Sequence, residues 1–512
     1  MDHMVVIMFE NRSFDNVLGY LYQADEAPTF EGLTGKNLSN PIPGDVPGAD
    51  QKVVPVHPAE NLDSPDPDPG EEHPHINTQL YGTVSPGENR FREIDDMQPP
   101  FNAPACPAVE PSMDGFVSDY INAFKVEMRR LPTYDEYAQI VACYTPEQLP
   151  VLSTLAKGFA CFDHWFCEVP SQTYCNRSFI HAASSSGLVN NSPVGTFEAK
   201  NDAPTIFERL AEAGKTWKVY IDPEQLVPAT ALIHARRLMP KFADRFRTIY
   251  DFYHDARTGE LPAYSFIEPN MLHPHTDMHP PGSCRLRHDL RLKDPNAMIG
   301  GELLLSRVYD AVKNSATESG SNYSNTLLIV TFNEHGGTYD HVPPPRVPPP
   351  VPFRGDEEEG FHFDRSGVRV PAIAISAWID KGTVVTGEFR HTSVIRTLRE
   401  RWSLGGPLTQ RDAVAADIAP LLTRTTPRPP GDWPSVVPRQ LPFLSSLEEK
   451  VFDRPLGCLE NNIVGEALAH EARYYDRPPA GDVRKMMRKD AIVHMKRIRD
   501  NMFPGISKGL TS

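Results

Sequence analysis

Glu168–Ser186, EVPSQTYCNRSFIHAASSS, is the stretch around which the rest of the chain is organised. The aromatic-rich run Phe159–Phe166 leads into it and is typical of a strand that crosses a core. Pro170 and Ser171 then break that strand, and Phe179–Ala183 has the apolar pattern that opens a helix. The stretch therefore predicts a strand, a turn and a helix.

The predicted turn carries two hydroxyls, Ser171 and Thr173, and Asn176 and Arg177 follow them. The N–H groups and the dipole at the start of a helix favour an anion. A guanidinium can bind two oxygens of that anion at once. The arrangement suits a phosphoryl-transfer nucleophile, although Ser and Thr ahead of a helix usually serve only as N-caps.

The length and composition of the chain limit the possible domain organisation and binding partners. The 512 residues allow one large α/β domain with insertions, or two or three domains. A net charge of −16 argues against nucleic acid as a partner, because phosphate backbones require basic surface. The 51 prolines are about twice the average share and cluster, which indicates long irregular excursions. Seven cysteines form no CxxC pair, so a zinc ribbon has no support.

Targeting signals are lacking. The first apolar run, Met4–Phe9, is too short for a signal peptide. No run reaches the roughly 18 apolar residues of a membrane span. We expect a cytoplasmic protein, or an exported one if a leader precedes Met1 in nature; the oligomeric state stays open.

Ligand-type side chains follow two apolar runs that read as buried strands. Met4–Phe9 is followed by Glu10 and Asn11, and Thr326–Phe332, the strongest strand of the chain, is followed by Asn333–His341 (NEHGGTYDH). In open α/β sheets ligands bind just outside the carboxyl ends of the strands. Both positions are therefore candidates for a functional site. The first also has a structural interpretation, as a capped turn in which Ser13 or Asn11 is the N-cap of a helix through Leu21.

Two further loops gather acids and histidines, Asp66–Gln79 (DPDPGEEHPHINTQ) and His273–His279 (HPHTDMH). Clustered His and Asp could ligate a metal or contact a phosphate. For the first loop, a solvated turn is the commoner origin of such a composition.

The remaining pattern alternates buried strand and helix without hairpin signals, which predicts an α/β fold with a mostly parallel sheet. No Walker or Rossmann loop is present, which disfavours NTP hydrolysis and dinucleotide redox chemistry. We expect a catalytic domain at residues 1–426 with an irregular insertion at 26–112, and a Pro-rich linker with a helical C-terminal extension at 427–512. Further elements are expected as strands at Trp217–Ile221, Tyr264–Glu268 and Val370–Trp378, and as helices at Ser13–Leu21, Met113–Ala142, Pro150–Gly158, Pro204–Glu212, Ile299–Val312, Thr392–Trp402, Asn462–Tyr474 and Val483–Asn501.

Four segments together resemble the bacterial phosphoesterase family that includes phosphocholine-type phospholipases C and an acid phosphatase branch, within the alkaline-phosphatase-like superfamily. They are VVIMFENRSFD (Val5–Asp15), FDHWFCEVPSQTYCNR (Phe162–Arg177), LLIVTFNEHGGTYDHVPPP (Leu327–Pro345) and HTSVIRTL (His391–Leu398). The resemblance implies an alkaline-phosphatase-like fold, with a mostly parallel central sheet flanked by helices and long Pro-rich loop insertions.

The resemblance also implies roles for individual residues. The nucleophile maps to Thr173, with Ser171 as the fallback, because the family's hydroxyl lies three residues before its Asn-Arg pair. The implied set is Thr173, His279, Asn176 and Arg177 for catalysis, His73 (or His75), His341 and Asn11 for substrate binding, and Glu10, Asn11, Thr173, Asn333 and Glu334 for metal. Hard oxygen ligands of this kind suit Ca²⁺, Mg²⁺ or Mn²⁺.

Two positions depart from the family pattern. Cys175 stands where the family usually has proline, and Asn333 stands where it usually has aspartate. Asn333 offers a neutral carbonyl oxygen in place of a carboxylate. We therefore expect weaker metal binding, or histidines as the positive partner of the phosphate.

The implied function is metal-assisted hydrolysis of a phosphoester, such as a phospholipid headgroup, through a phosphothreonine intermediate. A phospholipase C-like phosphodiesterase is the preferred interpretation. The alternatives are an acid phosphatase-type phosphomonoesterase and a degenerate protein that only binds phosphoesters. Sulfatase or phosphotransfer chemistry also shares the expected fold.

Overall fold

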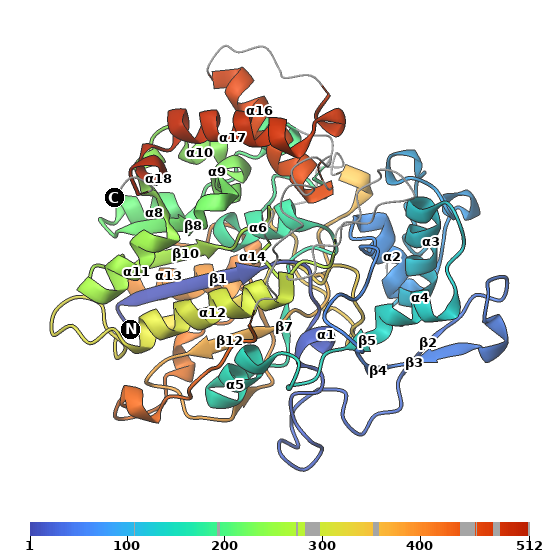
Figure 1. The fold of residues 1–512 in the computed structure, drawn as a ribbon, viewed down its shortest axis with the longest axis horizontal. Helices are drawn as coiled ribbons and strands as arrows, with labels where there is room; N and C mark the ends of the chain where they lie inside the picture. Colours follow the sequence, from blue (N-terminus) through green and yellow to red (C-terminus); the bar gives the residue numbers. More distant parts are fainter. Residues whose placement is uncertain are drawn as a thin grey trace.

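A computed structural model describes residues 1–106, 108–191, 195–272, 275–281, 297–351, 358–440, 456, 458–474 and 482–509. Its centre is an eight-stranded sheet (Figure 1). In spatial order the strands are β13 (Thr383–Val385), β6 (Ala160–Phe162), β12 (Ala372–Ile375), β11 (Thr326–Phe332), β1 (His3–Phe9), β10 (Tyr264–Glu268), β8 (Trp217–Ile221) and β9 (Phe246–Thr248). Within this sheet only β12 runs antiparallel to its neighbours. The expected mostly parallel α/β sheet is confirmed.

Strand β1 lies in the middle of the sheet. It pairs with β10 on one side and β11 on the other, and Met4–Phe9 is fully buried. A parallel strand covered on both faces reads as a continuous apolar run, because neither face meets water. The predictions for β1, β10 and β11 are confirmed, and their carboxyl ends point to one edge of the sheet.

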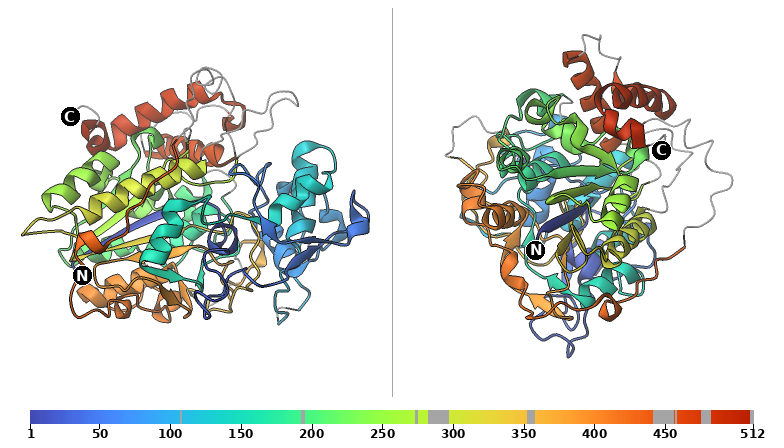
Figure 2. Two further views of the ribbon diagram at one scale, coloured as in Figure 1. Left: turned by 60° about the horizontal axis from the view of Figure 1, so that its bottom comes forward. Right: turned by 90° about the vertical axis from the view of Figure 1, so that its left-hand side faces the viewer.

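Helices cover both faces of the sheet (Figure 2). One face packs against α5 (Pro150–Gly158), α11 (Ile249–Thr258) and α12 (Ala297–Lys313), and the other against α6 (Thr173–Ala182), α8 (Ile206–Glu212) and α13 (Thr392–Trp402). The helices predicted at Pro150–Gly158 and Thr392–Trp402 are confirmed at both ends, and those at Pro204–Glu212 and Ile299–Val312 within two residues.

The organising stretch differs from the prediction. The run Phe159–Phe166 is not one strand: β6 belongs to the large sheet, and β7 (Trp165–Phe166) pairs with β14 (Phe389–Arg390). Helix α6 begins at Thr173, six residues before the predicted start, because the side chain of Asn176 satisfies the backbone of the preceding turn. Thr173 is therefore the first residue of the helix and does not precede it.

Two predicted helices are shorter than expected. Ser13 caps α1 (Phe14–Leu18) as predicted by accepting from Asn16 N, but this helix ends before Leu21. The region 113–142 divides into α3 (Phe116–Met128) and α4 (Tyr134–Ala138), since Arg129 adopts a left-handed conformation that ends α3.

A second lobe with its own hydrophobic core lies at the carboxyl end of β1 (Figure 1). It contains α2 (His73–Tyr81), α3, α4 and the short pairs β2 (Ser39–Pro41) with β3 (Val53–Pro55) and β4 (His57–Pro58) with β5 (Ala142–Cys143). Helix α2 falls within residues 26–112, where no periodicity predicted it.

The C-terminal helices pack onto the main core. They are α16 (Cys458–Tyr474), α17 (Arg488–Met502) and α18 (Pro504–Gly509). Helix α16 contacts α9 (Ala229–Ile233), and the ring of Phe503 lies 5.5 Å from that of Phe246. The two amphipathic helices expected in this region are confirmed, with α17 starting five residues later than predicted.

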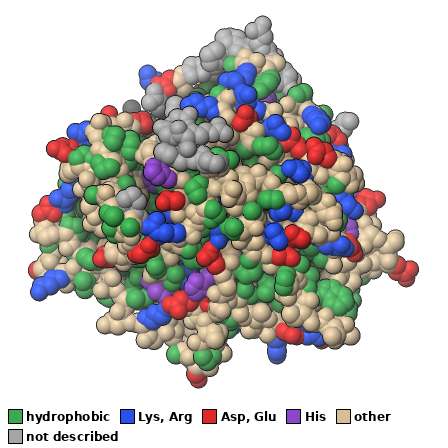
Figure 3. Space-filling view, turned by 180° about the vertical axis from the view of Figure 1, so that it is seen from behind, with side chains coloured by type: hydrophobic (Ala, Val, Ile, Leu, Met, Phe, Trp, Pro, Cys, Tyr) green, Lys and Arg blue, Asp and Glu red, His purple; other side chains and the backbone are tan. Residues whose placement is uncertain are grey.

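The surface gives little indication of function. On the face seen in Figure 3, acidic and basic side chains are interspersed with apolar ones. Across the described ranges, no helix combines the length and the hydropathy needed to cross a bilayer.

Candidate active site and metal centre

Hydrogen bonds to the side chain of Asn333 join the carboxyl ends of β1 and β11. Asn11 and Glu334 each donate a backbone N–H to Asn333 Oδ1, at 2.8 and 2.7 Å. Asn11 has a φ of 56°, a left-handed conformation that Asn tolerates better than most residues. Gly336 faces it, and a Cβ there would lie 2.3 Å from Asn11 O. Only glycine allows the two turns to approach this closely.

The first set of functional side chains, the nucleophile group, consists of Glu10, Thr173, Arg177 and Asn333. Glu10 binds the other members. Its Oε2 accepts from Thr173 Oγ1 at 3.3 Å and from Asn333 Nδ2 at 2.7 Å, and its Oε1 accepts from Arg177 Nε at 2.7 Å. All four side chains are buried. The structure thus brings together residues that are far apart in the sequence.

Charge within the nucleophile group is largely compensated. Burial raises the pKa of Glu10 to about 7, although the Arg177 guanidinium opposes this rise. Arg177 follows Thr173 by four residues, so both side chains lie on one face of α6. One donor of the guanidinium, Nη1, has no hydrogen-bond partner in the described chain.

Asn176 and Ser171 shape the turn before α6. Asn176 Oδ1 accepts from the backbone N–H of Glu168 and Val169, both at 2.9 Å, and its Nδ2 donates to Ser171 O at 2.8 Å. Ser171 Oγ donates to Val189 O at 2.6 Å. Asn176 therefore holds the turn, and the Ser171 hydroxyl is engaged with the backbone.

A second set, the acid group, consists of Asp68, Glu71 and Glu334 with His279 and Asn11. The ligand-type atoms of Asp68, Glu71 and His279 lie within 4.8 Å of one another. Asn11 Nδ2 donates to Glu71 Oε2 and lies 2.9 Å from His279 Nε2. Glu334 Oε2 accepts from the backbone N–H of Gly336 at 2.5 Å.

The carboxyl groups of the acid group repel one another. Burial, followed by repulsion from Glu72 and Glu10, raises the pKa of Glu71 to about 8. Burial first and Glu71 second raise the pKa of Asp68 and of Glu334 well above the usual range. Such crowding favours a bound cation, since the charged forms need a positive partner.

The acid group fits a divalent metal ion. Asn11 Oδ1, Asp68 Oδ1 and Glu334 Oε1 are buried and have no hydrogen-bond partner within the described ranges. Oxygen donors of this kind are the ligands that Ca²⁺, Mg²⁺ and Mn²⁺ prefer. His279 Nδ1 lies 2.7 Å from Pro280 O and donates to it, so Nε2 is unprotonated. Its lone pair accepts from Asn11 Nδ2, which a bound ion would replace.

Asn333 is differently placed from the predicted ligand. Its Oδ1 accepts from two backbone N–H groups and its Nδ2 donates to Glu10, so no lone pair remains for a metal ion. Asp68 and Glu71 were not expected at the centre. Asp66–Gln79 is largely buried, so its interpretation as a solvated turn is wrong. The only feature of the sequence that points to a site in this loop is the run of acidic residues directly ahead of His73.

The two remaining predicted histidines lie in different places. His73, the first residue of α2, donates through Nδ1 to Pro170 O at 2.8 Å and so touches the turn before Thr173. His341 instead joins a separate charged cluster, where it contacts Asp15, and Arg369 bridges Asp15 and Asp340. This cluster already holds a cationic side chain. His273 lies outside the described residues.

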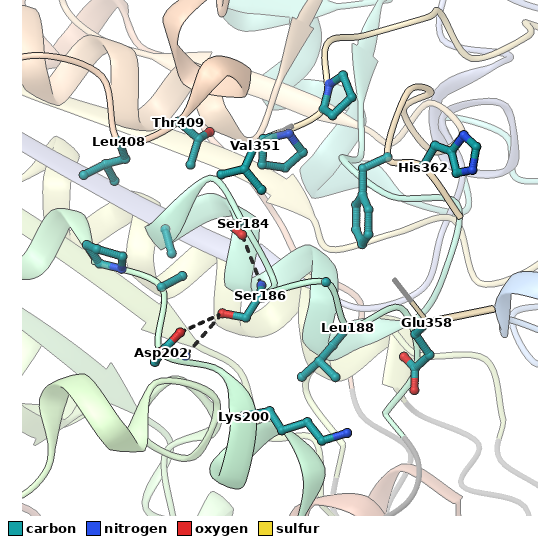
Figure 4. Close-up of a pocket in the computed structure, with 17 residues that line it drawn as sticks. Ser184, Ser186, Leu188, Lys200, Asp202, Val351, Glu358, His362, Leu408 and Thr409 are labelled. Carbon is teal, nitrogen blue, oxygen red and sulfur yellow. Dashed lines mark hydrogen bonds between the residues drawn. The ribbon is translucent and has the colours of Figure 1, made fainter. Parts of the chain in front are cut away.

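A cavity of about 640 Å³ opens at the other end of α6 (Figure 4). Ser184, Leu188, Lys200 and Glu358 are among its lining residues. Among the described residues that line this cavity, none belongs to the nucleophile group or the acid group.

Comparisons with known proteins relate the chain to enzymes of one family. A model of the Phosphoesterase family matches residues 1–405. Non-specific phospholipase C3 of Arabidopsis thaliana is 32% identical over 451 residues, which cover 85% of this chain and 75% of the plant protein. Phospholipase C A of Mycobacterium tuberculosis is 26% identical over 56% of each chain. A solved structure of a Vibrio parahaemolyticus protein in the alkaline phosphatase superfamily overlaps 54% of this chain and 63% of its own, with 16% identity and a TM-score of 0.29.

Proposed function

The chain belongs to the Phosphoesterase family and is a phosphoric ester hydrolase, and from that premise we propose that it is a phospholipase C-like phosphodiesterase with Thr173 as its nucleophile. The observation that carries the proposal is the place of Thr173. It is the buried first residue of a ten-residue helix, and its hydroxyl donates to Glu10. An anion is favoured at this point by the helix N-terminus.

The contacts of Thr173 support a direct displacement. Oγ1 forms a bond to phosphorus while the bond from phosphorus to the departing alcohol oxygen breaks. The hydroxyl proton passes to Glu10 Oε2, which is within hydrogen-bond reach and whose pKa lies near neutrality. The alkoxide takes a proton from water, and the hydroxide that remains takes the proton held by Glu10. A second water then cleaves the bond between phosphorus and Thr173 Oγ1, which restores the hydroxyl and releases the phosphate monoester of the other substituent.

Arg177 is the protein group best placed to offset charge on the phosphoryl oxygens. Its Nε and Nη2 are held by Glu10, while Nη1 has no partner in the described ranges. Donors fixed before the reaction stabilise developing charge without reorganisation. Asn176 acts as a positioning residue, because its amide binds only the turn and its neighbours.

The acid group would hold Ca²⁺, Mg²⁺ or Mn²⁺ through Asp68, Glu71, Glu334, His279 Nε2 and Asn11 Oδ1. When bound, the ion supplies positive charge for the substrate phosphate and relieves the repulsion among the carboxylates. His279, which the resemblance places in the catalytic set, would thereby act as a ligand.

A diester substrate is favoured by the plant and mycobacterial relatives, which are named phospholipases C. His73 lies beside the turn, and its ring lies 4.7 Å from that of Phe361, which is only half-buried. This pair offers an aromatic wall of the kind that the second substituent of a diester needs.

Hydrolysis of nitrophenyl-phosphorylcholine and nitrophenyl phosphate tests the proposal. Each substrate is offered to the purified full chain with EDTA and with added Ca²⁺, Mg²⁺ or Mn²⁺. We expect preference for the choline diester, loss of turnover in EDTA and recovery with one of the ions. Preference for the monoester would make the protein a phosphatase, and failure on both with every ion would overturn the hydrolase assignment.

Thr173→Ala tests the nucleophile, with Ser171→Ala as its matched control. We expect Thr173→Ala to lower kcat by at least about 10³-fold, because no covalent intermediate can form. Ser171→Ala loses only a hydrogen bond to Val189 O and should keep most turnover. Wild-type enzyme that is acid-quenched during turnover of the choline diester should yield a peptide in which Thr173 carries a phosphorylcholine group on mass spectrometry. The same group on Ser171 would contradict the assignment.

A further inference from the structure

One side chain connects the two loops that carry the acid group. Gln79 in α2 donates through Nε2 to Gly70 O at 2.7 Å, between Asp68 and Glu71. Its Oε1 lies 2.7 Å from His335 Nε2, next to Glu334 in sequence. Because the amide oxygen can only accept, His335 Nε2 donates, and His335 Nδ1 then faces Glu334 Oε2 at 3.6 Å. Gln79 thus binds both loops.

Gln79 is itself held rigidly by the second lobe. Its Nε2 also donates to Asp119 Oδ2 at 2.8 Å, and Asp119 Oδ1 lies 2.8 Å from His75 Nδ1. Gln79 and Asp119 are buried almost completely. The side-chain amide therefore has its two hydrogens and its oxygen engaged, and α2 and α3 fix its position.

The two loops meet without spare room. Gly337 has a φ of 65°, and a Cβ there would lie 2.6 Å from Gly70 O and 3.2 Å from Gln79 Nε2. Any larger residue would push the Gly70 carbonyl away from Gln79. Backbone contact and the Gln79 bridge together determine how far Glu334 stands from Asp68 and Glu71.

We propose that Gln79 is a positioning residue that sets the spacing of the metal ligands and, through it, which ion the centre prefers. The inference rests on the proposed metal centre. Mg²⁺ requires ligands at about 2.0–2.1 Å in near-octahedral geometry, whereas Ca²⁺ accepts about 2.3–2.6 Å and a flexible arrangement. A bridge that fixes the separation of two ligand-bearing loops should therefore affect the binding affinity for the smaller ion, Mg²⁺, more than that for Ca²⁺.

Gln79→Met tests the inference, because methionine keeps the length of the side chain and removes all three hydrogen bonds. The full chain is stripped with EDTA, and Ca²⁺ and Mg²⁺ dissociation constants are measured by titration calorimetry without substrate. Loss of an outer-shell partner typically costs about 10–100-fold in metal affinity. We expect a loss in that range for Mg²⁺, a smaller loss for Ca²⁺, and a Ca²⁺/Mg²⁺ affinity ratio shifted by at least about threefold.

Gln139→Met is the matched control. Gln139 donates to Asp66 O at 2.7 Å and also to Tyr120 Oη, and within the described ranges its side chain makes no hydrogen bond to the His335 loop. We expect its Ca²⁺/Mg²⁺ ratio to equal that of the wild type. A wild-type chain that binds neither ion would refute the metal centre itself. A folded Gln79→Met chain with both wild-type constants, or with the same ratio as Gln139→Met, would overturn the role of Gln79 alone.

If Gln79→Met does not fold, the double variant Gln79→Glu with Asp119→Asn tests the role of Gln79 instead. The amide introduced at position 119 can donate to the new carboxylate at position 79. That carboxylate still accepts from His335, but Gly70 O loses its donor. We expect the folded double variant to keep a weakened Mg²⁺ affinity and the shifted ratio. Wild-type affinity and ratio would show that the Gly70 contact is dispensable and would overturn the proposal.

Discussion

The nucleophile group and the acid group are neighbours, yet they treat buried negative charge in opposite ways. In the nucleophile group Glu10 has a guanidinium, an amide and a hydroxyl as partners. In the acid group three carboxyl groups face the neutral His279 and the amide of Asn11. The protein alone compensates the negative charge of the first group, whereas the second group needs a cation. The two groups should therefore respond to substitution with opposite signs.

Arg177→Met should give the largest change. It leaves Glu10 buried without its ionic partner, and breaking a buried pair in this way costs about 3–5 kcal/mol of unfolding free energy. Urea unfolding in EDTA measures the loss. In the double variant Glu10→Gln and Arg177→Met, the unpaired charge is gone, so at least half of the loss should be recovered. Equal instability of the single and double variants would mean that Glu10 is not compensated by Arg177.

The pH dependence of the metal-free protein should come next in size. Glu10 and Glu71 have folded-state pKa values of about 7 and about 8, above the ordinary 4.5, so the folded state binds more protons. Their contribution to stability is therefore complete below about pH 4.5 and is lost as the pH rises to about 8. We expect unfolding free energy in EDTA to fall by several kcal/mol from pH 5 to pH 8, because each group contributes about 1.4 kcal/mol per pH unit between its unfolded and folded pKa values. Saturating Ca²⁺ should remove most of that slope; an equal slope with and without the ion would contradict the fit of the acid group.

Glu71→Gln should reverse the sign seen with Arg177→Met. Without the ion, removal of one repelling carboxyl should raise unfolding free energy at pH 8 by about 1–3 kcal/mol. With the ion present, the loss of a charged ligand should weaken binding. Thermal melts in EDTA and in Ca²⁺ separate the two effects. If Glu71→Gln were less stable than the wild type in EDTA, the proposed repulsion within the acid group would be contradicted.

Asn333→Asp should have the smallest effect. It adds a carboxylate to the nucleophile group and so makes that group resemble the acid group. The amide that donates to Glu10 becomes a carboxylate facing it, so stability in EDTA should fall by about 1–2 kcal/mol. The added negative charge should tighten metal binding by about 3–10-fold. Competition against a chelator measures this, and an unchanged affinity would place residue 333 outside the reach of the ion.

The sequence predicts the nucleophile group better than the acid group for a physical reason. β1, β11 and α6 are read from apolar runs and from a turn, and their ends deliver Glu10, Asn333 and Thr173 to one edge of the sheet. Asp68 and Glu71 lie on a proline-rich loop whose position depends on contacts with α2 and α3. Local sequence patterns do not predict contacts between segments that are distant in the chain.

Side-chain partners are equally hard to foresee. Asn333 was expected as a ligand because the resemblance places a metal-binding residue at that position, but backbone N–H groups occupy its oxygen. Asn176 was expected to act on the substrate, and its amide instead holds the turn. Residue type limits what a group can do, and the neighbours select among those possibilities.

The central place of β1 has a consequence for synthesis on the ribosome. Met4 pairs with Tyr264 and Leu327, so β1 waits for partners made 260 and 323 residues later. At about 5–20 residues per second, the second partner emerges roughly 15–65 seconds after β1. During that interval the run MVVIMF has no sheet to join, and chaperone binding to this segment should decide how much of the nascent chain escapes aggregation.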